Sequence, residues 1–232
     1  MDKFEYQING KKILVYRSIY APVKSNMFVI LSGKEAVVFD PNVDEKLIAL
    51  LDSNGIKKIL ILLTHDHFDH TSGVNWLKES SNAELLCQSK CAERIARERG
   101  NIPQLVAFVL SEEDRKDGGH RYKDFRENFK PYSIKADRIF EKEERFNVED
   151  LEFHASSTPG HCPGSACYRL FDIMVFTGDT LLQFDPVITR FPESDELSYK
   201  EISLPFLENL PKDSIIMPGH GDPFILKDTN NI

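Results

Sequence analysis

The sequence predicts an α/β (α+β) fold in which two β-sheets pack against each other and helices cover their outer faces. Segments typical of strands and of helices alternate along the chain, but the strand-like runs cluster in two halves, which favours two sheets over one. There is no internal repeat and no low-complexity linker, and 232 residues are enough to bury one large core. The expected organisation is a single domain over residues 1–232.

Short apolar runs with β-branched residues dominate the first third of the chain, which is typical of strands. Turn signals such as Asn9-Gly10 and Ser32-Gly33 separate these runs. A segment with apolar residues at helical spacing follows and ends at Asn54-Gly55. The expected elements are strands at Lys12–Tyr20, Met27–Ser32 and Ala36–Asp40, and a helix at Val43–Ser53.

The next segment begins with a buried strand, continues with a polar stretch and then alternates again. We expect a strand at Lys58–Leu63, an extended polar loop at Thr64–His70, a helix from near Thr71 to about Lys78, a strand near Glu84–Cys87 and a helix from about Ser89 to Arg99.

A helical insertion is expected at about 101–135, because Ile102–Leu110 is apolar while Ser111–Lys130 is densely charged and contains Gly118-Gly119. We interpret it as a surface insertion with a mobile middle. The strand pattern then returns. The expected elements are strands at Leu151–Ala155, Ala166–Phe171, Met174–Thr177 and Ser214–Met217, a helix near Tyr199–Asn209 and a polar loop at Pro218–Pro223.

The charge of the chain restricts its partners. With 29 Lys+Arg against 37 Asp+Glu, the formal net charge is -8, which argues against nucleic acid or an anionic membrane as partner. No apolar run approaches the roughly 20 residues that span a bilayer, and the first residues do not resemble a signal peptide. Four cysteines do not make a disulfide framework. We expect a cytoplasmic protein that acts on a small-molecule substrate, either as a monomer or as a homo-oligomer.

The segment Thr64–His70, with the sequence THDHFDH, is the most informative part of the chain. In an extended loop, residues two apart face the same way, so His65, His67 and Asp69 are expected to converge while His70 points elsewhere. Imidazole and carboxylate groups together suit zinc, iron or manganese. Four such groups within six residues are enough for two ions in one pocket.

Three further residues fit a metal site, and each lies in a loop rich in glycine or proline. His161 lies between two Pro-Gly pairs, Asp179 follows a strand in the sequence TGDT, and His220 follows a strand in the sequence PGHG. Such loops are tight and fix the backbone, which is how a scaffold displays functional groups.

Taken together, these motifs resemble the metallo-β-lactamase superfamily over nearly the whole chain. The resemblance implies a four-layer αββα metallo-β-lactamase sandwich with a helical insertion, and a metal site at one edge of the two sheets. By position, His65, His67 and His161 would bind the first metal ion, and Asp69, His70 and His220 the second. Asp179 would bridge both ions, and Asp40 would be an acid that supports the ligands without binding metal.

This site implies a hydrolase. Two cations lower the pKa of a shared water and produce a hydroxide nucleophile near neutral pH. Asp69 is the carboxylate expected to orient that water or accept its proton. The expected cofactors are two zinc ions per chain, with iron or manganese as alternatives.

Among the members of the superfamily, the motifs are similar to those of glyoxalase II, but only twelve residues follow His220 in this sequence, and we expect it to lack the C-terminal helical domain that binds glutathione in that enzyme. The leading hypothesis is therefore hydrolysis of a thioester or related ester. Alternatives are an N-acyl homoserine lactonase, a phosphodiester hydrolase, and a redox member such as a persulfide dioxygenase with one iron. A metal-loaded binding protein with vestigial catalysis is a further alternative.

Other residues of interest receive simpler interpretations. We expect His120 to be solvated, His154 to be structural, and Cys87 and Cys91 to form a small buried pair. Cys162 stands where the motif commonly has threonine, and we expect a small packed side chain there. The aromatic residues of the insertion either line the substrate pocket as a lid or anchor the insertion to the body. They are Phe108, Tyr122, Phe125, Phe129 and Tyr132.

Overall fold

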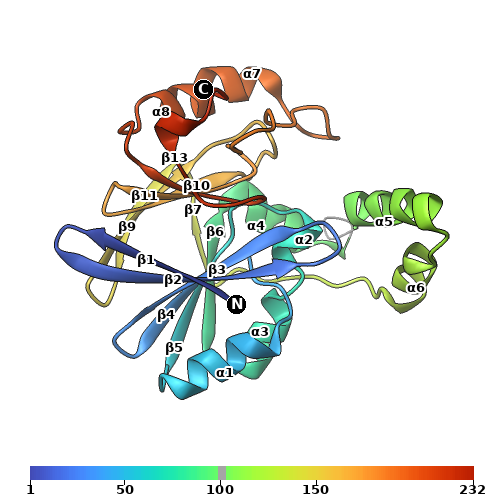
Figure 1. Cartoon of the computed structure of the whole chain (residues 1–232), viewed down its shortest axis with the longest axis horizontal. Helices are drawn as coiled ribbons and strands as arrows, with labels where there is room; N and C mark the ends of the chain where they lie inside the picture. Colours follow the sequence, from blue (N-terminus) through green and yellow to red (C-terminus); the bar gives the residue numbers. More distant parts are fainter. Residues whose placement is uncertain (99–102) are drawn as a thin grey trace.

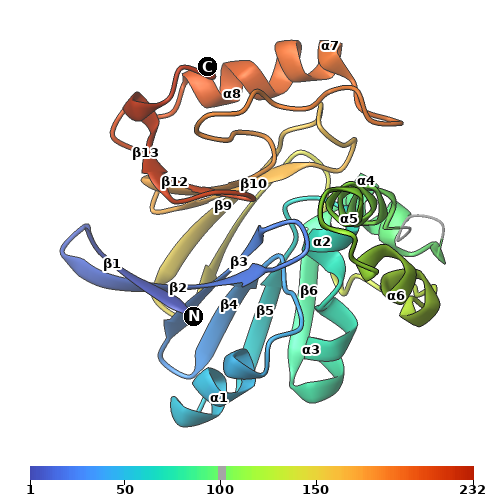
Figure 2. The same ribbon diagram turned by 45° about the vertical axis from the view of Figure 1, so that its right-hand side comes forward.

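Two β-sheets form the centre of the molecule, and helices cover the outer face of each (Figure 1). The computed structural model describes residues 1–98 and 103–232. The layers follow the order helix, sheet, sheet, helix, which the view in Figure 2 separates most clearly. The predicted four-layer sandwich is confirmed.

The first sheet has the strand order β1-β2-β3-β4-β5-β6-β7. Its first four strands are antiparallel, whereas β4 to β7 run parallel to one another. The strands are β1 (Asp2–Ile8), β2 (Lys11–Tyr20), β3 (Ser25–Ser32), β4 (Glu35–Phe39), β5 (Lys58–Leu62), β6 (Ala83–Gln88) and β7 (Arg138–Phe140).

The second sheet has the order β13-β12-β11-β10-β9-β8. Its strands pair antiparallel except for β11 and β12, which are parallel. The strands are β8 (Glu143–Val148), β9 (Leu151–Ser157), β10 (Ala166–Leu170), β11 (Met174–Gly178), β12 (Ile215–Pro218) and β13 (Phe224–Ile225).

The helices are short and lie mainly over the two outer faces. Those on the first sheet are α1 (Glu45–Ser53), α2 (Phe68–Thr71), α3 (Val74–Ser80) and α4 (Ser89–Ile95). On the second sheet, one helical segment consists of α7 (Glu196–Ser198), the π-helical turn η2 (Tyr199–Ser203) and α8 (Leu204–Glu208), and the 3₁₀ turn η3 (Leu226–Asp228) comes later.

Strand β3 shows why the apolar runs in the sequence are continuous rather than alternating. Phe28 and Ile30 face the core between the sheets, whereas Met27 and Val29 face the layer of α1, α3 and α4. Both faces of the strand are therefore removed from water, and each position favours an apolar side chain. A stacked pair, Phe39 and Phe176 with ring centroids 3.6 Å apart, joins the two sheets in the core.

Four strands of the structure were not predicted from the sequence: β1, β7, β8 and β13. Strands β1 and β8 lie at the edges of their sheets and alternate between exposed and covered residues. This period-two alternation is typical of a half-buried strand, but the many charged residues in both segments made the alternation hard to recognise in the sequence.

The insertion folds into α5 (Gln104–Asp117) and α6 (Arg121–Asn128), which pack on each other and project from the sandwich beside α2 and α4 (Figure 1). Helical structure was predicted here. The predicted start of the insertion at residue 101, and the predicted helix end at Arg99, lie outside the described residues. None of the helices in the described part of the chain has the length and apolar character needed to cross a membrane.

Candidate metal centre

The candidate ligands come together at one edge of the sandwich because they follow strands that end there. His65 lies just beyond β5, Asp179 just beyond β11 and His220 just beyond β12. Since β11 and β12 are parallel neighbours, their carboxyl ends place Asp179 and His220 side by side. His161 reaches the same edge from the loop between β9 and β10.

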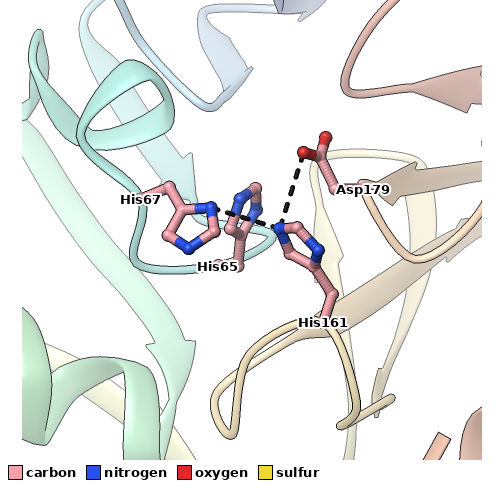
Figure 3. A group of neighbouring side chains, drawn as sticks. All are labelled: His65, His67, His161 and Asp179. Atoms are coloured by element: carbon pink, nitrogen blue, oxygen red, sulfur yellow. Dashed lines mark hydrogen bonds and ion pairs between the residues drawn. The ribbon is translucent and has the colours of Figure 1, made fainter. Parts of the chain in front are cut away.

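One group of side chains consists of His65, His67, His161 and Asp179, whose potential ligand atoms lie within 4.8 Å of one another (Figure 3). His67 Nδ1 is 3.1 Å from His161 Nε2, and His161 Nε2 is 3.6 Å from Asp179 Oδ2. The loops of His67 and His161 belong to different sheets, and their imidazoles point toward each other in Figure 3. The other ring nitrogen of His161, Nδ1, is 2.9 Å from the carbonyl oxygen of Ile188. This contact leaves Nε2 free to face the group.

A second group consists of Asp69, His70 and His220. Asp69 Oδ2 lies 3.3 Å from His70 Nε2 and 3.4 Å from His220 Nε2. Asp179 lies between the two groups, because its Oδ1 is 3.6 Å from His70 Nε2 and its Oδ2 is 3.6 Å from His220 Nε2. The structure thus brings all seven sequence-predicted site residues together.

The local prediction for Thr64–His70 was wrong in one respect. The segment is not extended throughout, because helix α2 begins at Phe68 and places Asp69 and His70 in its single turn. Consequently Asp69 joins His220 rather than His65 and His67, and His70 points into the centre rather than elsewhere. The helix expected from near Thr71 to about Lys78 is α3, which spans Val74–Ser80, and α2 is a separate helix that was not predicted. A helix of four residues has no apolar periodicity from which it could have been predicted.

Asp40 supports the centre from beneath. Its Oδ1 accepts a hydrogen bond from the backbone N–H of Thr64 at 2.7 Å, and its Oδ2 accepts one from the Thr64 hydroxyl at 2.6 Å. The same Oδ2 lies 2.9 Å from His70 Nδ1. This contact leaves His70 Nε2 facing Asp69 and Asp179. Asp40 has a positive φ of 49°, a conformation that aspartate and asparagine tolerate better than most residues.

The unsatisfied polar atoms of the cluster test whether the residues fit a metal. Buried polar atoms are normally hydrogen-bonded, because an unpaired one carries a desolvation cost of about 1–3 kcal/mol. Within the described part of the chain, four atoms of the two groups lack a hydrogen bond: His65 Nε2, Asp69 Oδ2, His70 Nε2 and Asp179 Oδ1. A cation would satisfy all four, and imidazole with carboxylate is the donor set that zinc and iron prefer. The residues therefore fit a metal centre.

The pKa values of four candidate-ligand histidines shift in two opposite directions, which depend on burial and on neighbouring carboxylates. Burial lowers the pKa of His67 to about 4 and the pKa of His65 well below its ordinary value. For His70, burial acts in the same direction, but the carboxylates of Asp69, Asp40 and Asp179 outweigh it and raise the pKa well above its ordinary value. The pKa of His220 is likewise raised, because the carboxylates of Asp179 and Asp69 outweigh burial.

The carboxyl groups shift in the opposite direction. Burial would raise the pKa of Asp69, but the neighbouring His70 and His220 outweigh it and hold that pKa well below its ordinary range. The pKa of Asp179 is lowered by His220, His70 and His161 against burial. Both carboxylates are therefore ionised at neutral pH.

These shifts predict that the two groups respond differently to pH. His65 and His67 are neutral near pH 6 and bind a cation without losing a proton, whereas His70 and His220 must each release one. Lowering the pH from 7 to 5.5 should therefore weaken metal binding more at the second group than at the first. Metal content after dialysis at stepped pH checks this. Parallel loss of both ions would contradict it.

A close approach of two loops requires a glycine at position 219. A Cβ atom built there would lie 2.2 Å from Asp179 Oδ1 and 2.9 Å from His70 Cε1. Any side chain at Gly219 would therefore displace groups of the centre, which explains the glycine before His220.

Phe68, between His67 and Asp69 in the chain, connects the centre to the insertion. Its ring centroid is 5.8 Å from those of Phe125 and Phe129 and 6.2 Å from that of Tyr132. Three of the five aromatic residues singled out in the insertion therefore pack against the ligand-bearing segment.

We expect replacing both Phe125 and Phe129 with alanine to raise the KM for a substrate of the centre several-fold, because the aromatic packing that positions Phe68 beside the centre is lost. Steady-state kinetics with the best substrate of the panel described below would measure this. The matched control is Phe108→Ala in the same insertion, since Phe108 is 62% exposed. An unchanged KM and selectivity in the double variant would exclude a role of these rings in substrate binding.

Sequence reasoning missed Phe191, whose ring lies 5.5 Å from that of His67 and 5.7 Å from that of His161. No local pattern marks it, because its loop between β11 and α7 has no periodicity. Cys162 is buried, and its Sγ is 3.3 Å from His67 Nε2. It is therefore a packed side chain that touches a candidate ligand.

The remaining histidines and cysteines lie apart from the two groups. His120 is exposed, and His154 is a mostly buried residue of β9 that contacts Arg169 and Glu143. Cys87 on β6 and Cys91 on α4 are fully buried in the core between that strand's sheet and the helices.

Comparisons with known proteins agree with the fold. The family model described as the metallo-beta-lactamase superfamily matches residues 20–220. A probable metallo-hydrolase of Bacillus subtilis, YqgX, is 24% identical and the match covers 86% of each chain. The hydroxyacylglutathione hydrolase GloC of Haemophilus influenzae is 27% identical over 81% of each chain. The crystal structure of the BLEG-1 B3 metallo-beta-lactamase is 26% identical, with a TM-score of 0.69 over 92% of this chain and 95% of that one.

The family match extends over most of the chain and includes every candidate ligand, from His65 to His220. The sandwich of two mixed sheets between helices is the fold found in the similar solved structures. This chain belongs to the metallo-β-lactamase superfamily of metal-dependent hydrolases.

Proposed function

We propose that this chain is a hydrolase that uses two metal ions, most simply two zinc ions, to cleave a thioester or related ester. The observation that carries the proposal is the position of Asp179. Its two carboxylate oxygens face different groups, Oδ1 toward His70 and Oδ2 toward His161 and His220. A carboxylate whose two oxygens face different sets of imidazoles can be shared by a pair of cations.

The first ion would be held by His65, His67 and His161, and the second by Asp69, His70 and His220, with Asp179 shared. When bound, the ions lower the pKa of a water molecule and polarise the substrate carbonyl. His161 and His220 each place their Nδ1 beside a backbone carbonyl oxygen, Ile188 and Val23 respectively. These contacts orient their Nε2 atoms toward Asp179.

Asp69 is the proposed catalytic carboxylate. Because its pKa is held well below the ordinary range, it is ionised over the whole physiological range and accepts hydrogen bonds. Its role is to orient the attacking water, since so low a pKa makes it a weak base. The buried setting of Asp69, at 3% exposure, keeps bulk water from competing for that carboxylate.

The similarity to the Haemophilus hydroxyacylglutathione hydrolase supports a thioester as the substrate class. The four cysteines are all free, which supports a reducing compartment such as the cytoplasm.

Metal analysis followed by a substrate panel tests the proposal. Mass spectrometry of protein purified without added metal should give close to two zinc ions per chain. A panel of a hydroxyacyl glutathione thioester, an N-acyl homoserine lactone and a bis-aryl phosphodiester should then give the highest kcat/KM with the thioester. A preference of about tenfold corresponds to about 1.4 kcal/mol of transition-state stabilisation.

Other results would point elsewhere. A preference for the lactone or the phosphodiester would replace the substrate class and keep the hydrolase. About one iron per chain, with oxygen uptake in the presence of a persulfide, would replace hydrolysis with redox chemistry. Full metal loading without turnover of any of these compounds would favour a binding protein.

A further inference from the structure

The beginning of strand β3 contacts two candidate ligands of the second group. The carbonyl oxygen of Val23 lies 3.1 Å from His220 Nδ1, and the Ser25 hydroxyl donates to the backbone oxygen of Asp69 at 2.9 Å. Ser25 and His220 also form an isolated antiparallel bridge between the two sheets. The second group is therefore assembled against a strand that contributes no ligand itself.

Asn26 fastens the loop of His220 on both sides of the histidine. Its side-chain amide donates to the carbonyl oxygens of Pro218 at 2.9 Å and Gly221 at 2.8 Å, and its backbone N–H donates to Gly219 at 2.7 Å. Asn26 is only 2% exposed, so these bonds do not compete with water. Three bonds from one residue span the loop Pro218–Gly221.

Arg17 on β2 holds the same loop from the outer side. Its guanidinium donates to the carbonyl oxygen of Gly221 at 3.1 Å and pairs with Asp222 at 2.7 Å and with Asp2 at 2.7 Å. The Arg17 side chain is 8% exposed and lies over the ring of Phe4, 5.2 Å from its centroid. A buried guanidinium that bonds a backbone carbonyl and two carboxylates has little freedom to move.

The first group is supported by other contacts. His161 is oriented by the carbonyl oxygen of Ile188, and His65 Nδ1 lies 3.0 Å from the Thr64 hydroxyl. Neither contact involves β2, β3 or the loop of His220. The two groups share Asp179 and the support of Asp40, which bonds both Thr64 and His70, whereas the contacts that Asn26 and Arg17 make with the loop of His220 reach the second group.

We propose that Asn26 and Arg17 are positioning residues for the second metal ion, which act by holding His220 in place. This inference rests on the proposed two-metal function. Loss of either side chain would loosen the loop Pro218–Gly221 and move His220 away from Asp69 and Asp179, while the ligands of the first ion stay in place. The second ion would then bind more weakly and the first would not.

The test measures metal binding rather than turnover. Metal-free wild type, Asn26→Ala and Arg17→Met are titrated with zinc in competition with a chromophoric chelator, which gives the affinity of each equivalent. Arg17→Met keeps an apolar stem over Phe4, so it remains informative if Asn26→Ala does not fold. Matched controls are Gln88→Ala, which removes a buried amide that donates to Glu141, and Arg169→Met, which removes a largely buried guanidinium on the other sheet. Circular dichroism checks the fold of each variant.

We expect both variants to bind the second equivalent about 10–100-fold more weakly, with the first equivalent changed less than about threefold, and the controls to match the wild type. Unchanged affinity for the second equivalent in folded variants would overturn the inference and leave the proposed function intact. Equal weakening of both equivalents would also overturn it. A wild type that binds fewer than two ions would instead refute the two-metal function on which the inference rests.

Discussion

Replacing Asp179 with alanine is expected to remove both metal ions and to lower kcat/KM by about 1000-fold or more, with the fold retained. Among the described residues, Asp179 is the one carboxylate that faces both groups, so its loss would take a ligand from each ion at once. Metal-based charge stabilisation amounts to several kcal/mol, and each 1.4 kcal/mol corresponds to about a factor of ten in rate. Metal analysis, steady-state kinetics and circular dichroism on the same preparation would measure the three quantities.

The control for this variant is Asp185→Ala, which removes an exposed carboxylate from the loop that follows Asp179. It should keep two ions and wild-type turnover. His161→Ala is the companion variant, because it removes a ligand from the first group only and should cost activity to a similar degree. Full metal content and full turnover in either Asp179→Ala or His161→Ala would refute the assignment of the centre.

Replacing Asp40 with alanine is expected to lower the free energy of unfolding by about 3–5 kcal/mol, because it leaves Thr64 and His70 without their buried partner. Alanine would also have to adopt a φ of 49°, which a residue without a polar side chain resists. Denaturant unfolding with a chelator present would measure this, since lost metal then contributes nothing to the difference.

Two further variants separate the causes of that loss. Asp40→Asn keeps an acceptor for the Thr64 amide and tolerates the left-handed backbone, so it should cost clearly less than alanine. Asp44→Ala removes a partly exposed aspartate that caps helix α1 and accepts a hydrogen bond from Ser18, and loss of the cap should cost only about 1 kcal/mol. A loss at Asp40→Ala no larger than that at Asp44→Ala would contradict the supporting role of Asp40.

The identity of the candidate ligands could be predicted from the sequence because it depends on local chemistry. His65, His67, Asp69 and His70 lie within six residues, and His161, Asp179 and His220 each stand in a glycine-rich loop after a strand. The sandwich could be predicted for the same reason, since the apolar runs and their turn signals are local patterns. The edge strands β1 and β8 were missed because alternating charged residues hide their covered face.

The family resemblance assigned the ligands to two groups by position, but the local pattern of the residues did not, because it placed Asp69 with His65 and His67. The turn of helix α2 at Phe68 rotates Asp69 toward His220 and His70 toward Asp179, and no apolar period marks so short a helix. The residues that hold the loop of His220 could not be predicted from the sequence either, because contacting residues such as Arg17 and Gly221 are 204 positions apart in the chain. Single ligands follow from residue type and neighbours in the chain. Their division into two groups follows from contacts between distant segments, which form only when the two sheets pack together.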